Sequence, residues 1–302
     1  MAEAKLELDV FMCYSAGISA CEKGEQWQVA LALLSEMGKS KLEPDVISYS
    51  AGISACEKSE QWQRAVALLS EMWEAKLEPN VISYSAGISA CDKGEQWQWA
   101  LALLSEMREV KLQPDVISYS AGMSACEKGG QWQRALALLS EMWEAKLDTD
   151  VIFGYSAGIS ACEKGEQWQR ALALLSEMAE VKLKPNAISY NAGISACEKG
   201  KEWQRALALL RELWEAKLEP TVISYSAGIS ACEKGGQWQP ALALLSEMRQ
   251  AKLEPSAISY NAGTSACGKG VQWQWALALL REMWEAKLET EVIYLQCWDQ
   301  RV

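Results

Sequence analysis

The sequence contains no histidine, so it lacks the side chain that most often acts as a general base or activates a nucleophile. It has ten cysteines but no CxxC pair, which argues against a metal site in a chain without histidine. No apolar run approaches the roughly 18 residues of a membrane-spanning helix, so we expect no membrane partner. The start, MAEAKLELDV, carries acids and no apolar stretch, so we expect no targeting segment in this chain. We therefore expect no enzymatic activity, no cofactor and no metal.

The dominant feature that is present is a unit of 35 residues, which occurs eight times with few changes. Each unit is marked by one tyrosine: Tyr14, Tyr49, Tyr84, Tyr119, Tyr155, Tyr190, Tyr225 and Tyr260. The units are residues 11–45, 46–80, 81–115, 116–150, 151–186, 187–221, 222–256 and 257–291. A fixed period in this range indicates a solenoid of stacked supersecondary units, each in contact with its neighbours.

The array is irregular at three places. The fifth unit is one residue longer than the others, through Phe153-Gly154 before its tyrosine. Residues 1–10 match the end of an incomplete repeat, and residues 292–302 open like a further repeat and then diverge. We expect either a segment of a longer array or an array with degenerate ends.

Apolar spacing within a unit predicts two antiparallel helices. In the second unit we expect a helix at Val46–Lys58, a second helix that starts near Glu60, and a loop that ends at Pro79, since proline disfavours helix at the residue before it. Asn80 is then a good N-cap for the next helix. Two helices per unit with short loops predict an all-α fold, an α-solenoid.

The first helix has three faces at about 100° per residue. An apolar face should pack on the second helix of the unit: Val46, Tyr49, Ile53 and Cys56. A face of small residues should meet the first helix of an adjacent unit: Ser48, Ala51, Gly52 and Ala55. The third face should line a groove: Ile47, Ser50, Ser54, Glu57 and Lys58.

Two residue types recur once per unit at positions that favour a packing role. We expect the cysteines to be buried small hydrophobes: Cys21, Cys56, Cys91, Cys126, Cys162, Cys197, Cys232 and Cys267. We expect the tryptophans to pack in the core rather than to stack on bases: Trp27, Trp62, Trp97, Trp132, Trp168, Trp203, Trp238 and Trp273.

The repeat resembles the pentatricopeptide repeat family over nearly the whole chain. The similarity lies in the 35-residue period, the V-I-S-Y-S or A-I-S-Y-N opening, the lysine that ends the first helix, the A-L-A-L-L-S-E-M run and the closing L-E-P-D. The resemblance implies a right-handed superhelix of helix-turn-helix hairpins that binds single-stranded RNA, one nucleotide per repeat. It also implies RNA processing, stabilisation, editing or translation in a mitochondrion or chloroplast.

The resemblance assigns roles to four positions of each unit. The second residue would sandwich the base: Met12, Ile47, Ile82, Ile117, Ile152, Ile188, Ile223 and Ile258. The lysine would approach the phosphate: Lys23, Lys58, Lys93, Lys128, Lys164, Lys199, Lys234 and Lys269. The fifth and last residues would read the base as pairs: Ser15 with Asp45, Ser50 with Asn80, Ser85 with Asp115, Ser120 with Asp150, Ser156 with Asn186, Asn191 with Thr221, Ser226 with Ser256, and Asn261 with Glu291.

In the family, a small hydroxyl at the fifth position leaves room for a purine, and asparagine there favours a pyrimidine. A closing asparagine then favours adenine, and a closing aspartate favours guanine. The pairs therefore predict a purine-rich target, 5′-G-A-G-G-A, followed by a pyrimidine, one unassigned nucleotide and a pyrimidine. The pair of Ser226 with Ser256 is a weak one, and the pair of Asn261 with Glu291 has no clear translation.

Other interpretations of these residues stay open. Interchange among Asp, Asn, Ser and Thr at the unit ends is also what N-capping alone would permit. The net charge of −11 is unusual for a nucleic-acid binder, so we expect the acids of the second helix and loop, such as Glu71, Glu74 and Glu78, to lie on an outer face. RNA binding would then depend weakly on salt. The alternative function is a helical scaffold for protein–protein interaction; for RNA processing, protein partners would supply the catalysis.

Overall fold

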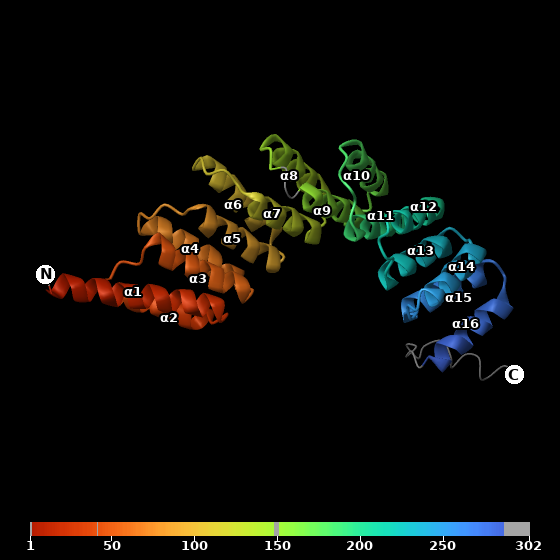
Figure 1. Cartoon of the computed structure of the whole chain (residues 1–302), viewed down its shortest axis with the longest axis horizontal. Coiled ribbons are helices and arrows are strands. Elements are labelled where there is room, and N and C mark those ends of the chain that lie inside the picture. Colours follow the sequence, from red (N-terminus) through yellow and green to blue (C-terminus); the bar gives the residue numbers. More distant parts are fainter. Residues whose placement is uncertain (1, 41, 148–150, 287–302) are drawn as a thin grey trace. The chain divides into compact units, whose positions relative to one another are not determined.

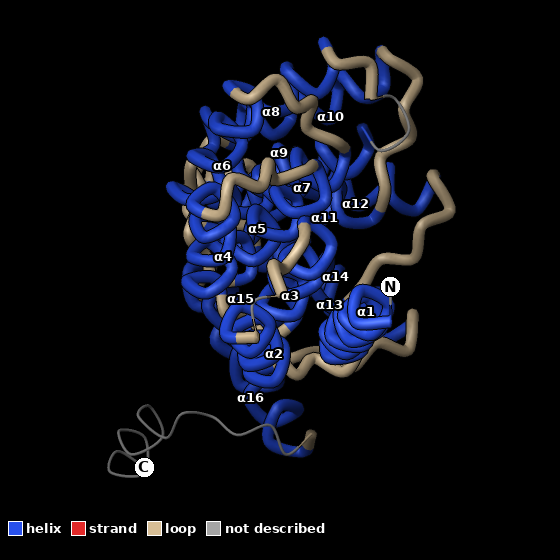
Figure 2. Tube along the Cα trace, turned by 90° about the vertical axis from the view of Figure 1, so that its left-hand side faces the viewer, coloured by secondary structure: helices blue, strands red, loops and turns tan. Residues whose placement is uncertain are grey.

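The computed structural model describes residues 2–40, 42–147 and 151–286, and within these ranges it contains sixteen helices and no strand. The first helices of the hairpins are α1 Ala2–Lys23, α3 Val46–Lys58, α5 Val81–Lys93, α7 Val116–Lys128, α9 Val151–Lys164, α11 Ala187–Lys199, α13 Val222–Lys234 and α15 Ala257–Lys269. The second helices are α2 Trp27–Lys39, α4 Trp62–Glu74, α6 Trp97–Glu109, α8 Trp132–Glu144, α10 Trp168–Glu180, α12 Trp203–Glu215, α14 Trp238–Gln250 and α16 Trp273–Glu285. The all-α hairpin repeat predicted from the sequence is confirmed (Figures 1 and 2).

The helices gather into two compact units, residues 1–161 and 162–302. In the first unit, α3 packs on α5 and α5 on α7, so these first helices form one layer, and α4 and α6 cover it. In the second unit, α11 packs on α13 and α13 on α15, with α12 and α14 as the covering layer. Within each of these two sets, a hairpin thus contacts its neighbours in the chain, which is the arrangement that a repeat solenoid requires.

Each second helix begins at a tryptophan, two residues later than the start near Glu60 that the sequence suggested. Glu60 has a positive φ of 59°, and the amide of Gln61 donates to the carbonyl of Cys56 at 2.9 Å. This closes α3 with a left-handed residue, as helix C-termini commonly do. The turn therefore takes up Glu60 and Gln61, and α4 starts at Trp62.

Gly52 allows the first helix to approach the second helices, not an adjacent first helix as we expected. A Cβ atom added to Gly52 would lie 2.7 Å from Leu34 Cδ1 of the preceding hairpin and 3.4 Å from Leu68 Cδ1 of its own. Ser48, on the same small-residue face, does meet the preceding first helix, through Ser15. The small-residue face therefore contacts both layers.

The core of each hairpin consists of residues that recur in every unit. Ile53, Ala55 and Cys56 of α3 are fully buried, as are Ala65 and Met72 of α4. The tryptophans pack between hairpins: a Cβ atom added to Gly94 would overlap the ring of Trp62 from the hairpin before it. The predicted burial is therefore confirmed for Cys56. Trp62 is half-buried against the next hairpin, whereas Trp273 is 64% exposed, so the predicted core role is wrong for Trp273.

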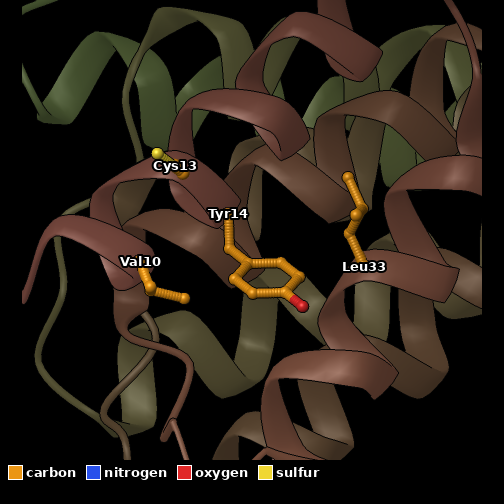
Figure 3. A pocket seen from close by; sticks show the side chains of 4 residues that line it. All are labelled: Val10, Cys13, Tyr14 and Leu33. Atoms are coloured by element: carbon orange, nitrogen blue, oxygen red, sulfur yellow. The ribbon is translucent and has the colours of Figure 1, made fainter. Parts of the chain in front are cut away.

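Some side chains that are buried in later hairpins are partly exposed in the first hairpin. Val10, Cys13, Tyr14 and Leu33 line an apolar hollow of about 340 Å³ (Figure 3). The equivalent tyrosine of the third hairpin, Tyr84, is fully buried. None of the described helices combines the length and the apolar character needed to cross a bilayer.

Candidate functional site

A row of exposed apolar side chains runs along the first helices. In seven of the units, the isoleucine or methionine at the second position is 57–68% exposed, although such residues are usually buried. These residues are Met12, Ile47, Ile82, Ile117, Ile188, Ile223 and Ile258. Their regular exposure fits a surface that covers a flat apolar ligand, which is the role that the family resemblance implies.

The fifth unit requires a correction, because its exposed residue is Phe153 and not Ile152. Phe153 is 56% exposed, whereas Ile152 is half-buried. The carbonyl of Ile152 accepts from Ser156 Oγ at 2.8 Å, as the carbonyl of Val46 accepts from Ser50 Oγ at 2.7 Å. Ile152 is therefore equivalent to the first residue of α3, and the inserted residue shifts Phe153 into the second position.

An open hollow of about 480 Å³ lies between Ile117 and Phe153. Ser120, Ala121 and Ser124 also line it. Its walls are thus second-position side chains of consecutive units, and Ser120, a fifth-position residue, also faces it. The volume is ample for one base between two apolar walls.

The fifth-position serines lie deeper than expected. Ser50, Ser85 and Ser156 are buried, with exposed fractions of 7, 6 and 4%, where the sequence predicted a groove-lining face. Ser15, Ser120, Asn191 and Ser226 are half-buried, and Asn261 is exposed. The serines are buried because α-helices of adjacent hairpins meet at this position, as the packing of α3 on α5 shows.

Five of the predicted reading pairs converge on a serine that sequence reasoning missed, the third residue of the next unit. Ser50 Oγ lies 2.7 Å from Ser83 Oγ, and Ser83 Oγ donates to Asn80 Oδ1 at 3.0 Å. Ser85 also donates directly to Asp115 Oδ1 at 3.1 Å. The same serine joins Ser15 to Asp45, Asn191 to Thr221, and Ser226 to Ser256, through Ser48, Ser224 and Ser259. The near-constant serine in the V-I-S-Y opening was the signal in the sequence.

The closing residues cap helices, as the capping interpretation predicted. Asp45, Asn80, Asp115, Asn186, Thr221 and Ser256 each accept from the main-chain amide of the third residue that follows. For Asn80 and Asp115, the capping atom is Oδ1. Within the described part of the chain, Asn80 Nδ2 and Asp115 Oδ2 make no hydrogen bond. One atom caps, and the other is available to a ligand.

Two predicted reading residues, Asp150 and Glu291, lie outside the described residues. The closing Thr221 and Ser256 use their one oxygen in the cap. Asn191 accepts from Ser224 Oγ at 2.6 Å through Oδ1. The units therefore differ in the polar atoms that the residues at positions five and 35 leave free for a ligand.

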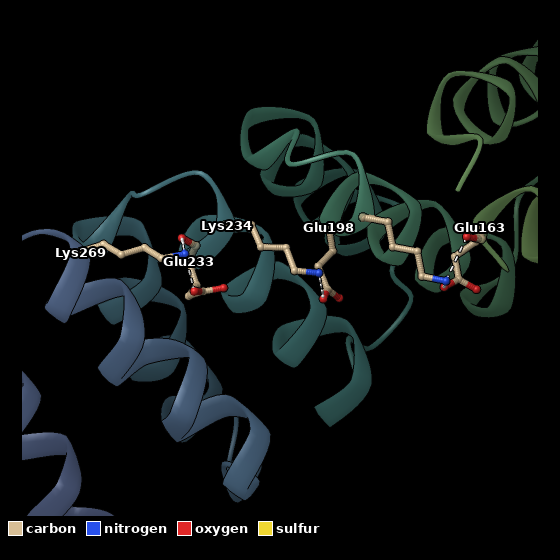
Figure 4. A network of polar contacts seen from close by, with 6 residues as sticks. Glu163, Glu198, Glu233, Lys234 and Lys269 are labelled. Atoms are coloured by element: carbon tan, nitrogen blue, oxygen red, sulfur yellow. Dashed lines mark hydrogen bonds and ion pairs between the residues drawn. The ribbon is translucent and has the colours of Figure 1, made fainter. Parts of the chain in front are cut away.

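The lysines that end the first helices form ion pairs with the preceding unit. The Nζ–carboxylate distances are 3.0 Å for Lys58–Glu22, 2.7 Å for Lys93–Glu57, 3.1 Å for Lys128–Asp92, 2.7 Å for Lys199–Glu163, 2.8 Å for Lys234–Glu198 and 2.5 Å for Lys269–Glu233. Figure 4 shows Glu163, Glu198 and Glu233 with their lysine partners. Lys23 and Lys164 end their helices in the same way. We refer to the six ion pairs with the distances given above as the acid–lysine ladder.

Of the ladder acids, Glu233 is held as a carboxylate by its hydrogen bonds. Burial raises the pKa of Glu233, but hydrogen bonds from Lys269 and Ser265 outweigh that effect and leave the pKa below its usual value. Glu71, Glu74 and Glu78 are exposed on α4 and the loop after it, as expected. Among the described residues, no three His, Cys, Asp or Glu side chains come together as a metal site.

The stacked helical hairpins define an α-solenoid repeat protein with a row of exposed apolar residues along its first helices. A family model described as "Pentatricopeptide repeat domain" matches residues 1–59, 32–94, 67–129, 137–200 and 208–270. A second model, "PPR repeat", matches residues 117–147. The chain belongs to the pentatricopeptide repeat family.

A solved structure of the family shares the fold. The pentatricopeptide repeat protein PPR10 from maize matches with a TM-score of 0.72 and 25% identity over 92% of this chain and 40% of that chain. PPR10 in complex with an 18-nt psaJ RNA element matches with a TM-score of 0.43 and 20% identity over 92% of this chain and 49% of that one. The present chain thus spans less than half of the PPR10 chains. Comparison with curated protein sequences gives no match.

Proposed function

We propose that the chain binds single-stranded RNA in a sequence-specific way and reads one nucleotide per repeat. The observation that carries this proposal is the spacing of two features in every complete described unit. An exposed apolar residue at the second position recurs together with a cap residue beside it. Membership of the pentatricopeptide repeat family supports RNA as the ligand.

The cap geometry supplies a physical basis for base choice. With Oδ1 engaged by Ser83, Asn80 presents an amide donor, Nδ2, which complements the N1 acceptor of adenine. With Oδ1 engaged by Ser118, Asp115 presents a carboxylate acceptor, which complements the N1–H and N2–H donors of guanine. The capping and reading roles are thus compatible at one residue.

The buried fifth-position serines support the same assignment. Ser50 Oγ lies 2.7 Å from the carbonyl oxygen of Val46 and 2.7 Å from Ser83 Oγ, so its hydroxyl is engaged within the protein. A short side chain at this depth leaves space for a purine above it. Thr221 and Ser256 have no second polar atom beyond the cap, so their units discriminate poorly among bases. The proposed target keeps the form G-A-G-G-A, pyrimidine, unassigned, pyrimidine.

The organelle and the effect of binding on the RNA are part of the same proposal. By family membership, the RNA would be an organellar transcript in a mitochondrion or chloroplast, and binding would affect its processing, stability, editing or translation. The chain itself would not be an enzyme, and protein partners would supply any catalysis.

An unbiased selection of bound RNA sequences tests the proposal most directly. We expect enrichment of the purine-rich target and at least about tenfold weaker binding of a scrambled sequence, in line with about 1–3 kcal/mol per misread base. The variant Ser50→Asn should move preference at the second nucleotide from purine to pyrimidine. Selection of unrelated sequences, or equal binding of both RNAs, would contradict it.

A scaffold for protein partners is the second candidate function. Trp73, Trp99 and Trp214 on the second helices are 39, 47 and 49% exposed, and exposed aromatic residues are enriched at protein interfaces. These residues lie on α4, α6 and α12, not on the helices that carry the exposed isoleucine row. If the scaffold is the main function, replacing all three by alanine removes partner binding and the selected RNA pool shows no consensus.

A further inference from the structure

We propose that the carboxylates of the acid–lysine ladder are specificity-determining residues of the RNA surface, which keep the path of the phosphates close to neutral. The inference rests on the proposed function, because it concerns how RNA is held there. The carboxylates are Glu22, Glu57, Asp92, Glu163, Glu198 and Glu233.

The ladder occupies the ammonium groups before any ligand arrives. Lys199 Nζ lies 2.7 Å from a carboxylate oxygen of Glu163 and also donates to the main-chain carbonyl of Glu163 at 3.1 Å. Lys128 bonds the carbonyl of Asp92 at 3.0 Å in the same way. Each ammonium has three donors, and in Lys128, Lys199 and Lys269 two of them are engaged by the end of the preceding first helix. The lysine therefore bridges adjacent units as well as facing solvent.

The carboxylates of the ladder are buried more deeply than the lysines. Side-chain exposure of the six carboxylates is 17–28%, against 33–48% for the lysines. A half-buried ion pair costs free energy to break, because one charge is left unpaired and poorly solvated. A phosphate that displaced a carboxylate would bear that cost, and one that approached the intact pair would meet no net positive charge.

Neutral ion pairs along the path of the phosphates change which contribution to the binding free energy controls RNA affinity. A basic groove binds any RNA by releasing counterions, and this part of the binding energy carries no sequence information. The ladder cancels that non-specific attraction at each step. Base contacts at Asn80, Asp115 and their equivalents then decide which RNA binds. The arrangement explains how a chain of net charge −11 can carry an RNA surface.

The test compares two triple variants with the same change in net charge. Glu57→Gln, Glu198→Gln and Glu233→Gln remove ladder acids and free Lys93, Lys234 and Lys269. Glu74→Gln, Glu144→Gln and Glu215→Gln remove exposed acids at the ends of second helices. Binding of the selected RNA and of a scrambled RNA is measured against salt concentration, with circular dichroism as the check on folding. Each single ladder variant is measured as well, in case the triple variant does not fold.

The ladder variant should bind both RNAs more tightly, with the larger gain for the scrambled one, so that the ratio of the two affinities falls. The slope of log affinity against log salt should steepen by about 0.7 for each freed lysine, roughly 2 for the triple variant. The control variant should leave the slope and ratio near those of the parent. Equal effects of both variants would overturn the inference. So would a parent chain that discriminates between the two RNAs while the ladder variant leaves the salt slope unchanged. A parent chain that does not discriminate between the RNAs would instead overturn the proposed function.

Discussion

Asn80 Oδ1 accepts two hydrogen bonds from Ser83, one from its main-chain amide and one from its hydroxyl, each at 3.0 Å. Nδ2 is therefore the atom that Asn80 can offer to a base. Replacing Asn80 by aspartate keeps the cap and exchanges this donor for an acceptor. We expect preference at the second nucleotide to move from adenine to guanine by about 1–3 kcal/mol, measured by titration with RNAs that differ only there.

Two companion variants separate reading from capping in this experiment. Asp115→Asn should produce the opposite change, from guanine to adenine, at the third nucleotide. Asn80→Ala should lower the free energy of unfolding by about 1 kcal/mol, because the cap is lost, and should weaken the preference for adenine. If Asn80→Asp leaves base preference unchanged while the protein stays folded, the closing residue is a cap and no more.

The wall formed by Phe153 gives a prediction about one position of the RNA. Phe153 and Ile117 bound the same hollow, and an aromatic ring stacks on a base more strongly than an aliphatic side chain. Phe153→Ala should weaken RNA binding by about 1–3 kcal/mol, and the loss should shrink when the fourth nucleotide is replaced by an abasic site. Ile152→Val, at the half-buried position beside it, serves as the control and should leave affinity unchanged. Equal losses in the two variants would mean that the exposed ring does not touch RNA.

Much of the fold could be predicted because each unit repeats the same local signals. The apolar spacing of Val46–Lys58 and the cap at Asn80 define a helix and its successor with little ambiguity, and both are confirmed. The eightfold repetition also makes an error in one unit visible against the others. Cys56 and six of its equivalents are buried, as one helical position predicted, whereas Cys21 is half-buried.

The incorrect predictions concern contacts between helices and hairpins, which the sequence of a single helix does not show. The burial of Ser50 arises from the neighbouring hairpin, and so does the ion pair of Lys58 with Glu22. The inserted residue in the fifth unit left two possible registers, which the hydrogen bond of Ser156 to Ile152 and the exposure of Phe153 distinguish. Gly52 was assigned to the wrong neighbour because a helical wheel shows which residues are small, not which layer they face.

The turn before α16 contains a strained residue that can be relieved. Val271 has a φ of 56°, in the left-handed region that β-branched residues disfavour, and it is 82% exposed. Gly130 occupies the equivalent turn with a φ of 65° and no atom within 4 Å of an added Cβ. Val271→Gly should therefore raise the free energy of unfolding by about 1 kcal/mol, and Gly130→Val should lower it by about 1–2 kcal/mol, measured by urea unfolding. A loss of stability in Val271→Gly would show that the side chain makes a contact that offsets the strain.

The buried thiols predict a loss of stability in alkaline solution. Burial raises the pKa of Cys56, Cys126, Cys162 and Cys232 from 9.0 to about 11, and that of Cys91 and Cys197 to about 12. In the unfolded chain these thiols ionise near their ordinary pKa, whereas in the folded chain they keep their protons. Their contribution is thus complete below pH 9 and falls as pH rises toward the folded pKa values. Urea unfolding at pH about 8 and about 10.5 should show this decline, and a variant with Cys56, Cys91 and Cys126 replaced by alanine should show a smaller one, since tyrosines and lysines still titrate. An equal decline in parent and variant would mean that the thiols do not control it.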